Sequence, residues 1–303
     1  MIENGIIDFD KVLYFTLKNS SIRGRFVKLD KAINSILKRH DYTLPVSLCL
    51  ADALSSCCCI GSLLKFNGYF TIQASGKEKL KTMLADYSNN GEIRGYVNYD
   101  KNALNGIKKD ASIDQLMHDG HLAFTAIESK SNKRYQGIIP VQKGSFSKCI
   151  DYYFKKSEQT NSEFICFSEF SNKTYISSAI LIQATPEELN DTSENKLNLF
   201  EEISLFLKSL NKSELLSRQV SMENILYKLF HSFEVRTQKE ITIKDNCRCS
   251  LDRVKNTLLN ISDEELDELT FSDGRLEVIC EFCKNLTKLT RQDLFSIRKS
   301  INS

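Results

Sequence analysis

The chain has 303 residues, of which 41% are hydrophobic and 26% charged, and its formal net charge is +2. This balance is that of an ordinary folded protein and excludes an intrinsically disordered chain. A dedicated nucleic-acid-binding protein usually carries a basic surplus, and this composition shows none. The length is sufficient for two or three compact units.

The N-terminus has no recognisable targeting sequence. Residues 1–11 mix acidic and apolar side chains, without a basic segment followed by an apolar run. The longest apolar stretch, 48–64, contains Asp52 and several serines and is shorter than the roughly 20 apolar residues that cross a bilayer. We therefore expect a cytoplasmic protein with no membrane partner. In that compartment the ten cysteines indicate metal binding, redox chemistry or core packing rather than structural disulfides.

Hydrophobic periodicity over residues 1–185 predicts one α+β domain with a mixed or antiparallel sheet. A strand at 23–29 is followed by a helix at 31–38, for which Asp30 is the expected N-cap. A longer apolar helix is predicted at 46–64. Further elements are expected as strands at 69–74, 80–87, 93–97, 121–127, 135–141, 164–170 and 176–183, and as a helix at 145–156. Asn89-Asn90-Gly91 predicts a hairpin turn between two of these strands.

From Pro186 onward the pattern becomes helical. Apolar residues at steps of three or four form one stripe, which consists of Leu197, Phe200, Ile203, Leu207 and Leu210. A second amphipathic stretch covers 222–230, and polar residues fill the space between the two. Such a segment gains most of its stability by docking its apolar stripe on another part of the protein. We therefore predict a metastable helical linker at 186–234.

The last part of the chain, 235–303, contains a distinctive cysteine pattern. Cys247-Arg248-Cys249 is separated by thirty residues from Cys280-Glu281-Phe282-Cys283. Zn²⁺ prefers four such soft ligands, and two sequence-local pairs bring them together at low entropic cost. The CxxC half is weak alone, but paired with CxC it is fairly specific. The pattern predicts one Zn²⁺ held by Cys247, Cys249, Cys280 and Cys283; the alternative is four unrelated thiols.

Residues around the cysteines predict a small α+β zinc-binding domain. Ser250 is a candidate N-cap for a helix starting at Leu251, and 262–265 forms a capping box for a second helix. Asp273-Gly274 predicts a turn, and a strand at 276–279 leads to Cys280.

A closed four-thiolate site leaves no position for a substrate water, so we expect a structural or regulatory role. Oxidants attack thiolates, and disulfide formation removes the metal ligands reversibly. The site can therefore act as a redox switch.

Other candidate sites are weaker. The four histidines, which are His40, His118, His121 and His231, have no useful spacing to the cysteines. The acidic run 263–268 is interpreted as a solvated helix face, and Cys57-Cys58-Cys59 as small residues of a buried helix, with a further oxidation site as the alternative. We find no nucleophile elbow, P-loop or Rossmann glycine pattern and predict no enzyme. A zinc-ribbon nucleic-acid-binding protein remains the alternative function, although the segment 263–273 is acidic where that class needs a basic face.

Several segments resemble the heat-shock protein 33 family, the redox-regulated holdase chaperones, and the similarity covers nearly the whole chain. The C-terminal cysteine block is the most specific part. The other matching segments are Leu64-Lys65-Phe66-Asn67-Gly68, Ile93-Arg94-Gly95-Tyr96, Arg134-Tyr135-Gln136-Gly137-Ile138-Ile139-Pro140, Tyr153-Phe154-Lys155-Lys156-Ser157-Glu158-Gln159 and Leu226-Tyr227-Lys228-Leu229-Phe230-His231.

The resemblance implies a core domain at 1–185 for client binding and dimerisation, the linker at 186–234 and the zinc domain at 235–303. It implies that the reduced, zinc-bound protein is inactive. Oxidative stress would form the disulfides Cys247–Cys249 and Cys280–Cys283, release Zn²⁺ and unfold the linker. The exposed apolar surface would then bind unfolding client proteins, and the active protein would be a homodimer.

Three features depart from the family pattern. Lys284 follows the last cysteine where the family often has glycine, so we expect a less relaxed turn. Ser177-Ser178-Ala179 replaces a glycine-rich stretch, and the triple cysteine 57–59 is not a family feature.

Overall fold

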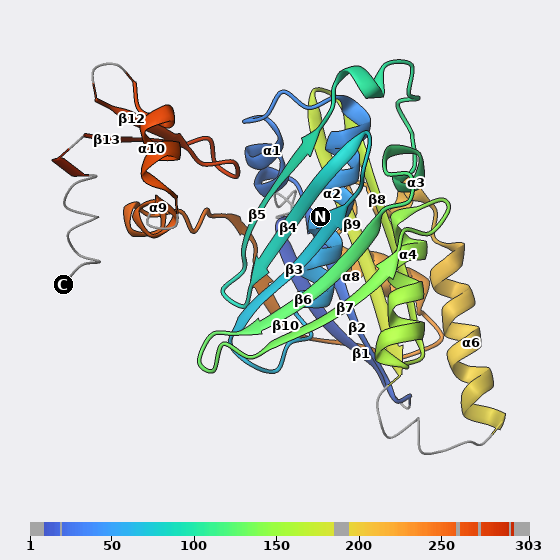
Figure 1. The fold of residues 1–303 in the computed structure, drawn as a ribbon. Helices are drawn as coiled ribbons and strands as arrows, with labels where there is room; N and C mark the ends of the chain where they lie inside the picture. The colour runs from blue at the N-terminus through green and yellow to red at the C-terminus, as the bar shows by residue number, and fades with distance from the viewer. Residues whose placement is uncertain are drawn as a thin grey trace. The chain divides into compact units, whose positions relative to one another are not determined.

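The computed structural model describes residues 9–18, 20–184, 194–258, 261–271, 274–290 and 292–293. Its contacts divide the chain into two units, Met1–Asp245 and Asn246–Ser303. The described part of the larger unit contains two β-sheets with helices, and that of the smaller one contains two helices and a two-stranded sheet (Figure 1). The predicted α+β class is confirmed.

The first sheet has five strands in the order β10-β1-β2-β9-β8, and all neighbours are antiparallel. Its strands are β1 (Lys11–Leu17), β2 (Ile22–Leu29), β8 (Ser162–Ser171), β9 (Thr174–Ala184) and β10 (Val235–Thr242).

The second sheet has six strands in the order β11-β5-β4-β3-β6-β7. Only the pairing of β11 with β5 is parallel. The predicted hairpin is present between β4 and β5, where Gly91 has a φ of +77°. The strands are β3 (Gly68–Ser75), β4 (Leu80–Ser88), β5 (Glu92–Tyr99), β6 (His121–Glu128), β7 (Arg134–Pro140) and β11 (Lys244–Asp245).

Helix α2 (Leu44–Gly61) packs between the two sheets and forms the centre of the main core (Figure 1). Its length and its mean hydropathy of 1.6 would suit a membrane span, but 83% of it is buried inside the protein.

Ser177 and Ser178 of β9 are also buried; their hydroxyls donate to Ala51 O and Val27 O. The remaining helical elements of this part are α1 (Lys31–Leu37), η1 (Asn102–Leu104), α3 (Ile113–Leu116), α4 (Phe146–Tyr153) and the π-helical η2 (Phe154–Glu158).

The other face of the five-stranded sheet is covered by the predicted linker. Helices α6 (Glu194–Ser209), α7 (Lys212–Leu215) and α8 (Met222–Leu229) supply the apolar residues that pack on it. Along β9, Ala179 and Leu181 belong to the main core, whereas Ile180 and Ile182 face the linker helices. The sheet is therefore apolar on both faces. From the predicted stripe Ile203, Leu207 and Leu210 are buried; the side chain of Leu197 lies outside the described residues.

Four of the described strands were not predicted, namely β1, β10, β11 and β13 (Leu286–Leu289). No element was expected for the residues of β1 or β10, and those of β10 were assigned to the C-terminal domain. β10 pairs with β1 at the edge of the sheet, and residues 235–245 belong to the larger unit. Because most of β10 is exposed, its position depends on backbone hydrogen bonds rather than on an apolar pattern. The C-terminal domain was expected to start at 235, eleven residues before the smaller unit starts at Asn246.

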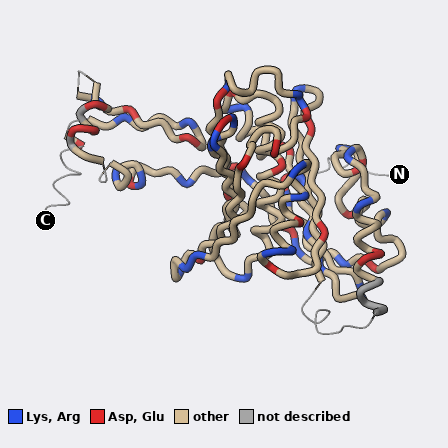
Figure 2. The backbone as a smooth tube through the Cα atoms, turned by 45° about the vertical axis from the view of Figure 1, so that its right-hand side comes forward, with Lys and Arg blue, Asp and Glu red and all other residues tan. Residues whose placement is uncertain are grey.

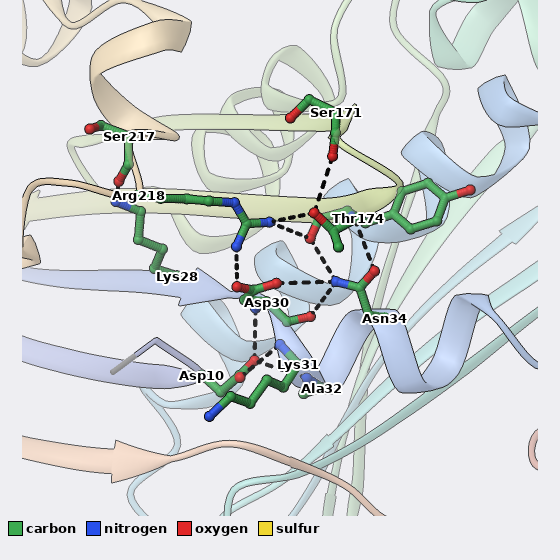
Figure 3. Close-up of polar contacts among 11 residues, drawn as sticks. Asp10, Lys28, Asp30, Lys31, Ala32, Asn34, Ser171, Thr174, Ser217 and Arg218 are labelled. Atoms are coloured by element: carbon green, nitrogen blue, oxygen red, sulfur yellow. Dashed lines mark hydrogen bonds and ion pairs between the residues drawn. The ribbon is translucent and has the colours of Figure 1, made fainter. Parts of the chain in front are cut away.

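The cap of α1 differs from the expectation. Asp30 occupies the N-cap position, but its side chain makes no capping hydrogen bond. Instead the carboxylate of Asp10 accepts from the N–H groups of Asp30, Lys31 and Ala32 at 2.8, 2.9 and 3.1 Å (Figure 3). Asp10 reaches this position because the pairing of β1 with β2 brings it next to the start of the helix.

The smaller unit contains α9 (Leu251–Leu258), α10 (Asp263–Leu269) and the hairpin of β12 (Leu276–Ile279) with β13 (Leu286–Leu289). Both predicted caps are present: Ser250 Oγ accepts from Arg253 N at 3.2 Å, and Ser262 and Glu265 form the capping box. In the predicted turn, Asp273 lies outside the described residues, and Gly274 has a φ of +79°.

Candidate metal centre

The structure brings the four predicted cysteines together. Cys247 and Cys249 lie in the extended segment before α9, and Cys280 and Cys283 lie in the loop of the β12–β13 hairpin. Their four sulfur atoms all lie within 4.8 Å of one another. Within the described ranges, this is the one group of three or more cysteine, histidine or acidic side chains placed to hold a metal ion.

The spacing of the sulfur atoms fits a tetrahedral ion. Four sulfurs at about 2.3 Å from one Zn²⁺ lie roughly 3.8 Å from each other. The Sγ atoms of Cys247 and Cys280 are 3.7 Å apart, and those of Cys249 and Cys283 are 3.4 Å apart. All four cysteines are free and half-buried. The donor set and its geometry therefore suit a soft divalent cation.

The protein groups around the four cysteines do not stabilise all four of them as thiolates. Burial raises the pKa of Cys249 to about 12, helped by hydrogen bonds to Cys283 and Cys247. Burial also raises the pKa of Cys283. Burial opposes ionisation of Cys280 too, but N–H groups of Cys283 and Phe282 donate to its sulfur and lower its pKa overall. A complete set of thiolate ligands therefore requires the charge of a bound cation.

The hairpin loop has a strained residue next to the last cysteine. The N–H of Lys284 donates to the carbonyl of Cys280 at 2.8 Å, and Cys280 N donates to Asn285 O at 2.9 Å. Lys284 adopts a left-handed conformation with a φ of +57°. This region favours glycine, so the expectation of a less relaxed turn at Lys284 is confirmed.

The smaller unit has little apolar material to hold it together. Among its described residues the buried apolar core consists of Leu258, Leu266, Leu276 and Leu289. A core of this size rarely stabilises an independent fold, and such units usually depend on a metal ion or on disulfides. The four cysteines lie where a metal ion would cross-link the hairpin to the segment before α9.

The remaining cysteines and the histidines lie elsewhere. Cys57, Cys58 and Cys59 are fully buried in α2, as the core interpretation predicts, and this leaves them inaccessible to an oxidant. All four histidines lie in the larger unit; His40 stacks on Tyr42 with ring centroids 4.6 Å apart. The structure contains no disulfide between the four clustered cysteines, and the disulfide pairs that the resemblance implies stay a prediction.

Sequence reasoning missed a polar cluster that joins the linker to the five-stranded sheet (Figure 3). The side chain of Lys28 is buried, and its Nζ donates to the carbonyls of Ser217 and Val220 at 2.5 and 3.5 Å. Arg218 forms an ion pair with Asp30 and donates to Tyr175 O at 3.2 Å. The position of Lys28 between the apolar residues Val27 and Leu29 of β2 was the sequence feature that could have indicated a buried partner.

Comparisons with known proteins agree with this architecture. The model of the family described as Hsp33 protein matches residues 10–289. The chain is 30% identical to the 33 kDa chaperonin of Caulobacter vibrioides over 296 residues, which covers 95% of this chain and 96% of that protein. It is 26% identical to the 33 kDa chaperonin of Proteus mirabilis, over 97% of this chain and 98% of that protein.

A solved structure shows the same fold. The crystal structure of the 33 kDa chaperonin from Thermotoga maritima superposes with a TM-score of 0.82 at 20% sequence identity. The match covers 98% of this chain and 100% of that one. From the family match and the Caulobacter relative we conclude that the chain belongs to the Hsp33 family.

Proposed function

We propose that this protein is a cytoplasmic, redox-regulated holdase chaperone. In the proposed cycle it is inactive when reduced and zinc-bound, and it binds unfolding client proteins after its four clustered cysteines are oxidised. The relatives' name, 33 kDa chaperonin, supports the chaperone role. The observation that carries the redox part is the group of four cysteine sulfurs within 4.8 Å in a unit with a four-leucine core.

The cysteines connect the fold of the small unit to its redox state. Bound Zn²⁺ would supply a cross-link among the four thiolates, which is worth on the order of 10 kcal/mol in units of this kind. Oxidation of Cys247 with Cys249, and of Cys280 with Cys283, removes all four ligands. In each pair two thiolates lose two electrons to form one S–S bond. One hydrogen peroxide takes up those electrons with two protons and leaves as two water molecules.

The linker provides the surface that such a switch can expose. Phe15, Phe26 and Ile180 lie on the face of the five-stranded sheet that α6 and α8 cover, and all three are nearly or fully buried. If the linker undocks, this sheet face and the apolar stripe of α6 become accessible together. A large exposed apolar surface binds other apolar chains, so we assign it to clients and to homodimer formation. The linker's stability depends on this docking, which makes it a suitable element to release.

The decisive experiment measures zinc, free thiols and client aggregation on one sample before and after peroxide treatment. We expect one zinc ion per reduced chain, the loss of that ion together with four thiols, and suppression of client aggregation only afterwards. Cys280→Ser should bind zinc weakly and lose the redox dependence. As a matched control, Cys58→Ser removes a buried thiol of α2 and should leave zinc content and the redox response unchanged.

Retention of zinc under conditions that oxidise other thiols of the protein would contradict the proposal. The alternative, a zinc-ribbon nucleic-acid-binding protein, predicts salt-dependent binding of nucleic acid in the reduced state. Lys and Arg positions are interspersed with Asp and Glu positions over most of the described chain (Figure 2). This charge distribution and the net charge of +2 favour the chaperone.

A further inference from the structure

A cavity of about 610 Å³ lies in the larger unit, lined by the C-terminal end of α2, strand β7 and the π-helix η2. Two segments that resemble the family, 134–140 and 153–159, contribute most of one wall. Neither segment takes part in the candidate metal centre. Their convergence on one cavity calls for a separate explanation.

The wall formed by β7 and η2 is closely packed. A Cβ atom at Gly137 would lie 2.8 Å from Cε2 of Tyr153 and 3.3 Å from Oγ of Ser157, so only glycine permits this approach. η2 is a single π-helical turn that ends at Glu158 and is followed by Gln159, whose φ is +50°. Such π turns are rare and frequently occur at functional sites. The backbone is thus shaped to place Tyr153 and Ser157 at the cavity.

The cavity combines an apolar floor with a polar rim. The apolar floor that a ligand can touch consists of Leu63, Leu64 and Ala126, which line the cavity and are half-buried. Polar groups at its rim include Arg134 and Gln136. A volume of this size lies within the roughly 300–1,000 Å³ range of small-molecule sites, which typically pair apolar walls with a few polar groups.

Two arginines, Arg23 and Arg134, line the cavity. Arg23 donates from Nη2 to Gln183 Oε1 at 3.3 Å, and its buried Nε has no hydrogen-bond partner there. Arg134 lines the cavity from the exposed start of β7. The nearby carboxylate of Glu158 accepts from Tyr153 OH at 2.6 Å. A guanidinium presents five N–H donors suited to a planar carboxylate, so these arginines offer donors to an anion.

We propose that this cavity binds a small amphipathic carboxylate. Its aliphatic or aromatic body lies on the apolar floor, and its carboxylate accepts hydrogen bonds from Arg23 and Arg134. The two arginines and Glu158 leave a net positive charge at the cavity, which favours one anionic group. The site lies entirely within the larger unit and does not depend on the redox state of the cysteines.

The test is calorimetric titration of the reduced full-length protein with octanoate, with octanol as the neutral counterpart. We expect octanoate to bind and octanol to bind at least tenfold more weakly, because hydrogen bonds to a charged group contribute substantially to affinity. Arg134→Gln should weaken octanoate binding about tenfold or more. Lys133→Gln is the matched control: it removes the same charge from the neighbouring residue, which does not line the cavity, and should leave binding unchanged.

Arg134 is exposed, so its substitution should not impair folding, which the unfolding curve of each variant checks. Arg23→Gln provides a second, independent loss of affinity. Equal binding of octanol and octanoate, or equal losses in Arg134→Gln and Lys133→Gln, would overturn the proposal. Octyl phosphate separates the two anion classes: binding tighter than that of octanoate would refute a carboxylate ligand.

Discussion

Nζ of Lys28, in the middle strand of the five-stranded sheet, donates a 2.5 Å hydrogen bond to the backbone carbonyl of Ser217, in the segment between α7 and α8. The two residues are 189 positions apart in sequence. No described carboxylate forms an ion pair with Lys28; its ammonium group lies 4.7 Å from the ring centroid of Phe9. One buried cation thus connects the sheet to the linker through backbone groups.

Replacing Lys28 with methionine should weaken the docking of the linker. Methionine is similar in length but leaves the carbonyls of Ser217 and Val220 without their donor, at a cost of about 1–3 kcal/mol. Hydrogen exchange of the α6–α8 amides in the reduced protein measures this docking directly. Lys31→Met, which changes an exposed lysine of α1, is the control. Equal exchange rates in the two variants would show that Lys28 does not hold the linker.

Because of Lys28, the free energy of unfolding should depend on pH in the alkaline range. Burial lowers the pKa of Lys28 to about 8, and the neighbouring positive charge of Arg218 adds to this. Between pH 8 and roughly 10.5 the unfolded chain keeps a proton that the folded chain has lost, so this group increases stability as pH rises. Below pH 8 both states are protonated, and the cost of burying the charge is fully present.

We therefore compare the free energy of unfolding of the wild type and Lys28→Met at pH 7 and pH 9.5. The free energy of unfolding of the wild type, relative to that of Lys28→Met, should be higher at pH 9.5 than at pH 7. A pH-independent difference would mean that Lys28 titrates at its ordinary value.

The sequence predicted those parts of the fold that depend on local pattern. The helix between the sheets and strands β3 to β7 of the six-stranded sheet follow from runs of apolar residues bounded by turns. Cys247, Cys249, Cys280 and Cys283 were also predictable, because metal ligands occur in short pairs whose spacing is visible in the sequence.

What could not be predicted depends on long-range partners. β10 has an exposed, polar sequence, and only its pairing with β1 makes it a strand. The buried role of Lys28 depends on a carbonyl far along the chain, and periodicity does not identify such a partner. The predicted cap of α1 was wrong for the same reason. Asp30 occupies the N-cap position, but Asp10 supplies the carboxylate that accepts from the N–H groups.

Substitution of these two aspartates tests that cap. Asp10→Ala removes the acceptor of three backbone N–H groups and should lower the free energy of unfolding by about 1–2 kcal/mol, as the loss of an N-cap does. Asp30→Ala removes the partially exposed ion pair with Arg218 and should cost about 1 kcal/mol or less. Urea unfolding of the reduced protein measures both. The reverse order would support the local cap that the sequence predicted.

Lys284→Gly should strengthen metal binding by the small unit. A left-handed conformation costs a residue with a Cβ about 1–2 kcal/mol, and glycine removes this cost. Glycine also gives the unfolded chain extra entropy worth about 0.4–1 kcal/mol, so the net gain lies between about 0 and 1.6 kcal/mol, or up to roughly fifteenfold in zinc affinity. Competition with a chromophoric chelator, using the full-length reduced protein, measures the change.

The Lys284 side chain also pairs with Glu281 at 2.7 Å, so its loss must be separated from the backbone effect. Lys284→Ala is the matched control, because it removes the same ion pair but keeps the Cβ. Both groups are substantially exposed, and such pairs contribute between about 0 and 1 kcal/mol. We expect zinc affinity to fall slightly in Lys284→Ala and to rise in Lys284→Gly. If the two variants bind zinc equally, the conformation of residue 284 does not limit the stability of the metal centre.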